Sequence, residues 1–169
     1  MDEGPGATAR TPLLRRAVPD DAPALADLIG QLAAHHGDRA TTDAATLRAD
    51  LFGPSPWATA LVAEEGTSLV GYALLVRLYR AQESARVMDL HHLFVAPGAR
   101  RAGIGRALIQ AAKAEARAQG CVRLVVGTHP DNHRAQSFYR MLGFADRPAG
   151  GPGFMRSLAP DRSGPGDDR

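Results

Sequence analysis

The sequence predicts a single α/β domain in which a mixed β-sheet is flanked by helices. The order of the hydrophobic patterns gives this class: one strand, two helices, three strands, and then alternating helix and strand. The composition agrees, because the 169 residues are 44% apolar and 22% charged, as in an ordinary globular protein. No internal repeat is visible in the chain. We therefore expect one domain with a real hydrophobic core rather than two small ones.

The N-terminal part predicts one strand and two helices. Residues 12–18, PLLRRAV, are typical of a short strand. Residues 19–36 predict a helix that Asp20 or Asp21 caps. The apolar stripe of this helix has helical spacing and comprises Leu25, Leu28, Ile29 and Leu32. Residues 41–52 predict a second helix, which ends at the Gly-Pro pair that follows it.

Three strands are expected next. Residues 57–65 and 68–79 indicate two strands joined by a turn at Gly66. Residues 85–97 indicate a third, longer strand that Pro97 ends. A glycine-rich loop follows this third strand directly.

A helix is expected to begin after the glycine-rich loop and to run to Gly120. Its apolar stripe comprises Ile104, Ala107, Leu108 and Ala111. Residues 121–128 then predict a short, buried strand that begins at Cys121.

The last predicted elements are one helix and one strand. Residues 131–143 predict a helix that Asp131 or Asn132 caps and Gly143 ends. A final strand is expected within residues 153–159.

The two ends of the chain differ from the middle in composition. Residues 1–11 and 159–169 are rich in glycine, proline and charge, so we expect two disordered tails. The folded domain is expected to span residues 12–158. The first residues contain no apolar stretch and do not resemble a signal peptide.

Charge and cysteine content argue against several classes of protein. The net charge is only +2, and no basic run is interleaved with aromatic residues, so no nucleic-acid partner is expected. No run approaches the ~20 apolar residues of a membrane span, so no membrane association is expected. Cys121 is the only cysteine, which rules out an intramolecular disulfide and fits a reducing, cytoplasmic location.

Residues 98–109, GARRAGIGRALI, form a candidate anion site between a strand and a helix. The first amides of a helix have no internal partners, and the helix dipole adds positive potential there. A dinucleotide loop would need glycine at Leu108, and a nucleotide-triphosphate loop would need Lys-Ser or Lys-Thr after Gly103. The loop therefore either binds another anionic group or is a plain turn with solvated arginines.

Two motifs resemble the GNAT family of N-acetyltransferases. Arg100-x-x-Gly103-x-Gly105, after a strand that ends in LFVAP, is similar to the acetyl-CoA loop of the family. Residues 132–144, NHRAQSFYRMLGF, resemble its second motif, Asn-x-x-Ala-x-x-Phe-Tyr-x-x-x-Gly-Phe. The resemblance covers residues 13–144 and looks closest to the diamine and small-amine acetyltransferase branch.

The resemblance implies a GNAT, or acyl-CoA N-acyltransferase, fold with a mixed, mostly antiparallel central sheet. It implies an enzyme that moves an acetyl group from acetyl-CoA, its co-substrate, directly to a primary amine of a small molecule, with no metal. The alternatives are a protein lysine or N-terminal acetyltransferase of the same fold and a non-catalytic acyl-CoA-binding sensor. The sequence leaves open the acceptor, the length of the acyl group and the oligomeric state, for which a homodimer is one option.

The resemblance also assigns an acetyl-CoA site. In the family, the sheet splays between the strand that ends here at Val95 and the strand that begins near Cys121, and pantetheine lies in that gap. Backbone groups of Leu93, Phe94 and Val95 would then pair with it like a missing strand. The other residues assigned to the cofactor are Arg100, Arg101, Ala102, Gly103, Ile104, Gly105, Arg106, Asn132, Arg134 and Ala135.

Tyr139 is a candidate general acid. Spacing alone makes it a core aromatic, because it shares a helix face with Ala135, Phe138 and Leu142. In the family motif, the tyrosine at this position protonates the departing coenzyme A thiolate. The chemistry fits, since a phenol of pKa about 10 is a neutral donor at neutral pH and a thiolate of pKa about 8.5 needs a proton.

His91 is a candidate base for the acceptor amine. An alkylamine of pKa ~10.4 is almost wholly protonated at neutral pH, so a base or a water relay is useful. Polyamine-acetylating relatives carry a Glu-Asp pair where this strand has His91 and His92, so their negative charge is missing here. If strand pairing is regular, Asp89, His91 and Leu93 share one face and His92 lies on the other.

Other interpretations of the histidines and the cysteine stay open. One of the paired histidines can pack in the core while the other faces solvent. Because adjacent strand residues point to opposite faces, the pair is poorly placed to chelate one metal ion. His35 and His36 end the first helix, where the helix dipole favours them. Cys121 is expected to pack rather than to act as a nucleophile.

Overall fold

The computed structural model describes residues 12–147 and Phe154. The chain divides into two compact units, Met1–Asp131 and Asn132–Arg169. The first unit holds the sheet, and the second holds one helix among its described residues. Both predicted tails, the expected domain end at residue 158, and all of the predicted last strand except Phe154 lie outside the described residues.

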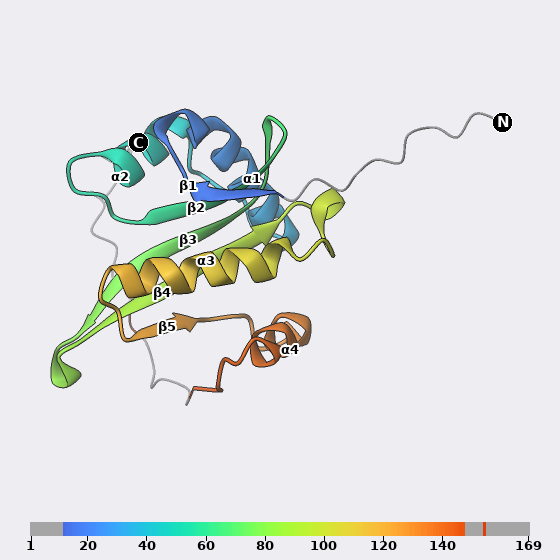
Figure 1. Cartoon of the computed structure of the whole chain (residues 1–169). Coiled ribbons are helices and arrows are strands. Elements are labelled where there is room, and N and C mark those ends of the chain that lie inside the picture. Colours follow the sequence, from blue (N-terminus) through green and yellow to red (C-terminus); the bar gives the residue numbers. More distant parts are fainter. Residues whose placement is uncertain (1–11, 148–153, 155–169) are drawn as a thin grey trace, which may run out of the picture. The chain divides into compact units, whose positions relative to one another are not determined.

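The first unit is built on a five-stranded sheet with the strand order β1-β2-β3-β4-β5 (Figure 1). The strands are β1 (Leu13–Arg16), β2 (Thr59–Glu65), β3 (Ser68–Arg80), β4 (Ala85–Val95) and β5 (Arg123–Val126). The first four pair antiparallel with their neighbours, and β5 pairs parallel with β4. The prediction of a mixed, mostly antiparallel sheet is therefore confirmed.

Helices cover both faces of this sheet (Figure 1). They are α1 (Ala22–His35), α2 (Ala44–Phe52) and α3 (Ile104–Ala118). One face packs against α1 and α2, where Leu25, Leu28 and Leu47 meet the sheet residues Tyr72 and Phe94. The other face packs against α3, which buries a hydrophobic stripe comprising Ile104, Leu108, Ile109, Ala112 and Ala116. Each helix thus buries its apolar stripe, which is the main contribution to its stability.

The start of α1 differs in detail from the expectation. Asp21 stands at the N-cap position, but its side chain makes no capping hydrogen bond. A short 3-10 turn, Pro19–Asp21, precedes the helix instead. The Asp21 carboxylate accepts from the backbone N–H of Val18 at 2.7 Å and from Arg15 at 2.6 Å. The aspartate therefore ties the helix to β1 rather than capping it.

A β-bulge interrupts β4 at the paired histidines. Leu74 of β3 lies opposite His92, whereas the next residue, Leu75, lies opposite Leu90. His91 is the extra residue between these two pairs, so regular alternation does not hold there. The expectation that His91 and His92 point to opposite faces assumed regular pairing and does not hold at the bulge, since their rings stack with centroids 4.8 Å apart and planes 16° from parallel.

The sheet splays beyond the middle of β4. β5 pairs only with Val87–Leu90, so His91–Val95 continue without a strand partner on that side within the described part of the chain. β5 also begins at Arg123 rather than at Cys121. The amide of Cys121 instead donates to the carbonyl of Ala116 at the end of α3, at 2.9 Å.

Candidate functional site

The glycine-rich loop presents the start of α3 without a side-chain cap. Gly103 occupies the N-cap position with φ +78°, a left-handed conformation that glycine adopts at no steric cost. Its carbonyl accepts from the N–H of Ala107 at 3.0 Å, but no side chain bonds to the first amides of the helix. Apart from Gly103 itself and its chain neighbours, no described heavy atom lies within 4 Å of the place where a Cβ of Gly103 would stand. The loop therefore offers free backbone donors in an open space.

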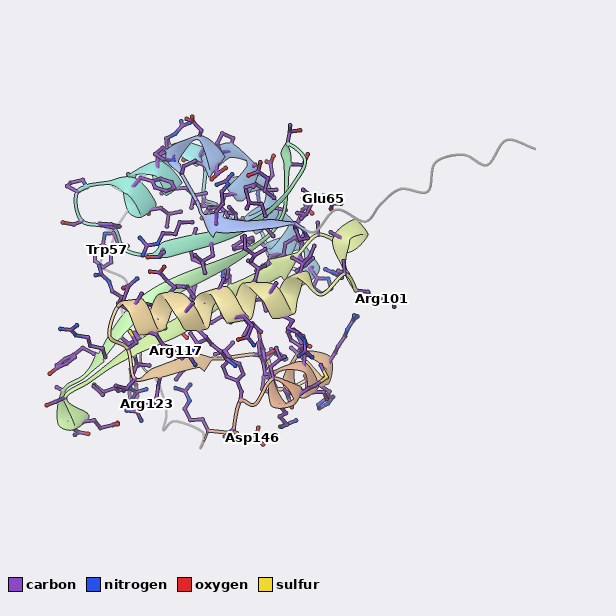
Figure 2. All side chains as sticks on the ribbon, in the orientation of Figure 1. Trp57, Glu65, Arg101, Arg117, Arg123 and Asp146 are labelled. Atoms are coloured by element: carbon purple, nitrogen blue, oxygen red, sulfur yellow. The ribbon has the colours of Figure 1, made fainter. Side chains whose placement is uncertain are left out.

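The two arginines of the loop have different surroundings. The Arg100 Nε–H donates to the carbonyl of Val95 at 2.9 Å, and its guanidinium lies 5.8 Å from the ring centre of Phe94. Arg100 therefore fixes the loop to the end of β4. Arg101 is exposed with φ +72°, and Figure 2 shows its side chain projecting from the loop at the N-terminal end of α3. Arg101 is free to meet an anion in solvent.

The other predicted cofactor residues of the loop can act through their backbone. The Ile104 side chain packs in the core with only 2% of its surface exposed, so only its amide faces the loop. Ala102 and Arg106 are exposed, and Gly105 is half-buried in the first turn of α3. The structure brings all of these residues together around the start of one helix.

The unpaired edge of β4 leads from the bulge to this loop. The Phe94 side chain is buried against α1 and α2, and the side chains of Leu93 and Val95 are half-buried. Their backbone groups therefore remain as the features that a ligand can use. An unpaired strand edge is a template on which an extended ligand can form hydrogen bonds.

A cluster of polar rings surrounds the bulge. The Tyr72 hydroxyl lies 3.1 Å from Nδ1 of His92, and their rings meet edge to face. The His91 side chain is 55% exposed, and its Nδ1 lies 3.6 Å from Oδ2 of Asp89. The bulge turns His91 toward His92. His91 meets solvent, while His92 reaches the buried Tyr72.

Burial lowers the pKa of His92, and its neighbours His91 and His36 lower it further. His92 is therefore neutral at pH 7, because a lowered pKa lies further below that pH than the ordinary value of ~6.5. Burial also raises the pKa of Tyr72, so its hydroxyl keeps its proton. The pair is thus held together by a hydrogen bond between neutral groups.

Tyr72 is a member of this cluster, and His36 influences it electrostatically; the sequence pointed out neither. His36 follows α1 and was explained by the helix dipole alone, yet it acts on His92, far away in the chain. The contact of Tyr72 with His92 could be predicted only from the register of β3 on β4, and the bulge changes that register. No local pattern in the sequence carries that register.

The second unit contains the other predicted site residues on α4 (His133–Met141). Asn132, and not Asp131, caps this helix, because its side-chain oxygen accepts from the N–H of Ala135 at 3.0 Å. Arg134 is exposed in the first turn. The ring of Tyr139 meets that of Phe144 edge to face, with centroids 5.6 Å apart.

Burial raises the pKa of Tyr139. A higher pKa keeps the phenol protonated at neutral pH, which a proton donor requires. The ring of Phe138 also packs beside that of Tyr139, at 5.8 Å between centroids. The tyrosine is therefore a packed aromatic and a neutral donor at the same time.

The first unit offers a proton acceptor, free backbone groups and an open helix start along one strand and its loop. Across residues 12–147 and Phe154, no three His, Cys, Asp or Glu side chains are arranged to hold a metal ion. None of the described helices is long and apolar enough to span a membrane. The chemistry available here is proton transfer combined with binding of an anionic, extended ligand.

The chain matches known acetyltransferases in sequence. The model of the acetyltransferase (GNAT) family matches residues 27–144. The chain is 31% identical over 144 residues to the thialysine N-epsilon-acetyltransferase of Bos taurus, a match that covers 79% of this chain and 84% of that enzyme. It is 34% identical over 86 residues to the uncharacterized N-acetyltransferase YhfO of Bacillus subtilis, which covers 51% of this chain and 58% of that protein.

The fold is also similar to that of a solved structure. The crystal structure of a probable acetyltransferase superimposes with a TM-score of 0.75 at 25% identity, over 86% of this chain and 99% of that one. The family match spans more than half of the chain and includes the glycine-rich loop, the bulge and Tyr139. The chain is therefore an acyltransferase that belongs to the acetyltransferase (GNAT) family.

Proposed function

We propose that this enzyme transfers an acetyl group from acetyl-CoA directly to a primary amine of a small molecule. The observation that carries the proposal is the unpaired edge of β4 between the histidine bulge and the glycine loop. From His91 to Val95 this edge is about 13 Å long at ~3.3 Å per residue. The amide groups of pantetheine would pair with it, and the pyrophosphate would lie against the first amides of α3.

His91 would serve as the base. Its exposure lets an amine or a bridging water reach the imidazole, which takes one proton from the acceptor ammonium. The neutral amine nitrogen then attacks the thioester carbonyl carbon and forms the new C–N bond. His92 stacks on His91 and would hold its ring in place rather than exchange protons itself.

Tyr139 would serve as the acid, by resemblance to the family motif. When the C–S bond breaks, the sulfur leaves as a thiolate and takes the phenolic proton of Tyr139. The products are the acetylated amine and free coenzyme A. The raised pKa of Tyr139 supports this role, because the phenol stays protonated until the thiolate appears.

The acceptor is proposed to be a small amine other than a polycation. The bovine relative is named for acetylation of the ε-nitrogen of thialysine. At the bulge, Asp89 supplies one carboxylate, while His91 and His92 add no negative charge that would favour a polyamine. We therefore expect thialysine and other small amines of low net positive charge to be better acceptors than spermidine.

A panel of acceptors tests the proposal. Purified enzyme and acetyl-CoA are mixed with thialysine, a diamine, spermidine, an aminoglycoside or a lysine peptide, and released thiol is measured. We expect acceptor-dependent release with one or more of the small amines and little with the peptide. Release with the peptide alone would assign the chain to protein acetylation. Binding of acetyl-CoA without release in any mixture would make the protein a sensor and overturn the proposal.

A further inference from the structure

A groove lies at the opposite end of α3 from the glycine loop. It encloses about 840 Å³, and the residues that define its character are Arg16, Trp57, Arg77, Arg86, Gln119 and Gly120. Because α3 has 15 residues, its two ends lie about 22 Å apart. Figure 2 shows Trp57 at one end of this helix and Arg101 at the other. The groove is therefore separate from the proposed acetyl-CoA site.

Two of the groove arginines lie on one face of the sheet. Arg77 lies two residues after Leu75 in β3, so the two side chains point to the same face of the sheet. Arg86 lies opposite Tyr79, which is two residues beyond Arg77, so Arg86 shares that face as a diagonal neighbour. A Cβ at Gly120 would stand 3.3 Å from Nη1 of Arg86, which places this guanidinium against the end of α3.

The groove carries uncompensated positive charge. Arg16 is paired with Glu115, with Nη2 2.5 Å and Nε 2.9 Å from the carboxylate oxygens. Neither Arg77 nor Arg86 forms an ion pair with any residue that the structure describes, and no described acidic residue lines the groove. The C-terminal end of α3 contributes about half a negative charge. About one and a half positive charges therefore remain without a partner.

Trp57 supplies a flat apolar surface beside these charges. Trp57 is 80% exposed, which is unusual because tryptophan is highly buried on average. Its backbone is fixed nevertheless, because its N–H donates to the carbonyl of Asp50 at 2.8 Å. An exposed indole on a fixed backbone is suited to stacking on a planar ring.

We propose that this groove binds a small planar anion, that is, an aromatic ring that bears a phosphate or carboxylate group. The ring would stack on Trp57, and the anionic group would accept hydrogen bonds from Arg77 and Arg86. Both a nucleoside monophosphate and an aromatic acid have this chemistry. The ligand is distinct from the acetyl donor and from the amine acceptor.

Trp57 also provides the measurement, because the intrinsic tryptophan fluorescence of the chain comes from it alone. The enzyme is first saturated with coenzyme A, and is then titrated with adenosine monophosphate or with 4-hydroxybenzoate. Adenosine and inorganic phosphate serve as the neutral planar and the non-planar anionic controls. We expect saturable quenching by one or both planar anions, and at least about tenfold weaker binding of each control compound. The planar anion that binds more tightly indicates whether the natural ligand carries a phosphate or a carboxylate group.

The double variant Arg77→Gln/Arg86→Gln is expected to weaken this binding at least about tenfold. Arg80→Gln is the matched control. Arg80 lies on the same strand, three residues after Arg77, so its side chain points to the other face of the sheet. This control variant should leave the affinity unchanged. If the double variant does not fold, the two single variants serve in its place. The proposal is overturned by an absence of saturable quenching in the folded enzyme that is saturated with coenzyme A, or by equal affinity in the arginine variants.

Discussion

His92 and His91 are neighbours in the chain with different surroundings. His92 reaches the buried hydroxyl of Tyr72, whereas His91 lies at the surface beside Asp89. Because the pKa of His92 is lower in the folded than in the unfolded state, the unfolded state binds more protons below pH ~6.5. The contribution of His92 to stability is therefore present above that pH and is lost as the pH falls toward the lowered value.

We predict that His92→Gln reduces the sensitivity of the fold to acid. The wild-type protein should lose more of its free energy of unfolding between pH 7 and pH 5 than the variant does, because glutamine takes up no proton. Thermal unfolding at a series of pH values measures the difference. Parallel curves of Tm against pH would show that the protonation of His92 is not coupled to folding.

We predict a different result for His91→Gln, which removes the proposed base at the surface of the same bulge. Acetylation of one small amine should slow about tenfold or more, and the acidic limb of the rate against pH should flatten. The profile is measured at saturating acetyl-CoA, with His92→Gln as the neighbouring control. An acidic limb identical to that of the wild type would remove His91 from the mechanism.

At the scale of elements, one ion-pair cluster fixes the entry to α1. Arg15 of β1 donates to both carboxylate oxygens of Asp21, at 2.6 Å and 2.9 Å, and to Glu64 of β2 at 2.7 Å. Only 8% of the surface of Asp21 is exposed. The hydrogen bonds from Arg15 lower the pKa of Asp21, so the stability that this carboxylate provides is present above pH ~3.9 and is lost as the pH falls further.

We predict that Asp21→Asn lowers the free energy of unfolding by about 2 kcal/mol, because Arg15 loses one charged partner in a partly buried place. Asp20→Asn is the matched control, since Asp20 is exposed and adjacent in the chain. Urea unfolding at pH 7 gives both values. Equal losses in the two variants would mean that the Arg15 pair does not stabilise the fold.

The glycine loop gives a prediction about binding. Gly103→Val should raise the Kd for acetyl-CoA at least about tenfold, because the new side chain would fill the open space beside the first amides of α3. Gly66→Val is the matched control: Gly66 has φ +66° and also has no atom within 4 Å of its absent Cβ. Both variants bear similar backbone strain. Calorimetry should show weaker binding only for Gly103→Val, and unchanged affinity in the folded variant would exclude this loop.

Most elements of the fold could be predicted because each has a strong periodic pattern. The stripe from Leu25 to Leu32 and the long apolar run of β4 are visible without tertiary information. The bulge at His91 could not be predicted, since it depends on how β3 and β4 align. The 3-10 turn before α1 was missed for a similar reason: the bond from Arg15 to Asp21 exists only after β1 and α1 pack together.

The candidate site was predictable where a motif occupies one stretch of chain. Residues of the glycine loop surround one helix start because they are contiguous in sequence. By contrast, Tyr72 meets His92 from another strand, β3. Spacing in a single sequence carries no signal for such contacts.

For the molecule as a whole, family membership gives the class of reaction. That the acyl donor is acetyl-CoA and the acceptor is a small primary amine is proposed. In the most direct measurement, purified enzyme is mixed with the best acceptor amine and with acetyl-CoA that is labelled in its acetyl group. The labelled amide and free coenzyme A are then quantified by mass spectrometry for the wild type and for Tyr139→Phe. Equal amounts of both products are expected from the wild type, and a rate roughly 100-fold lower from the variant, whose affinity for acetyl-CoA should barely change. Free coenzyme A without labelled amide, or no transfer to any amine, would contradict the account.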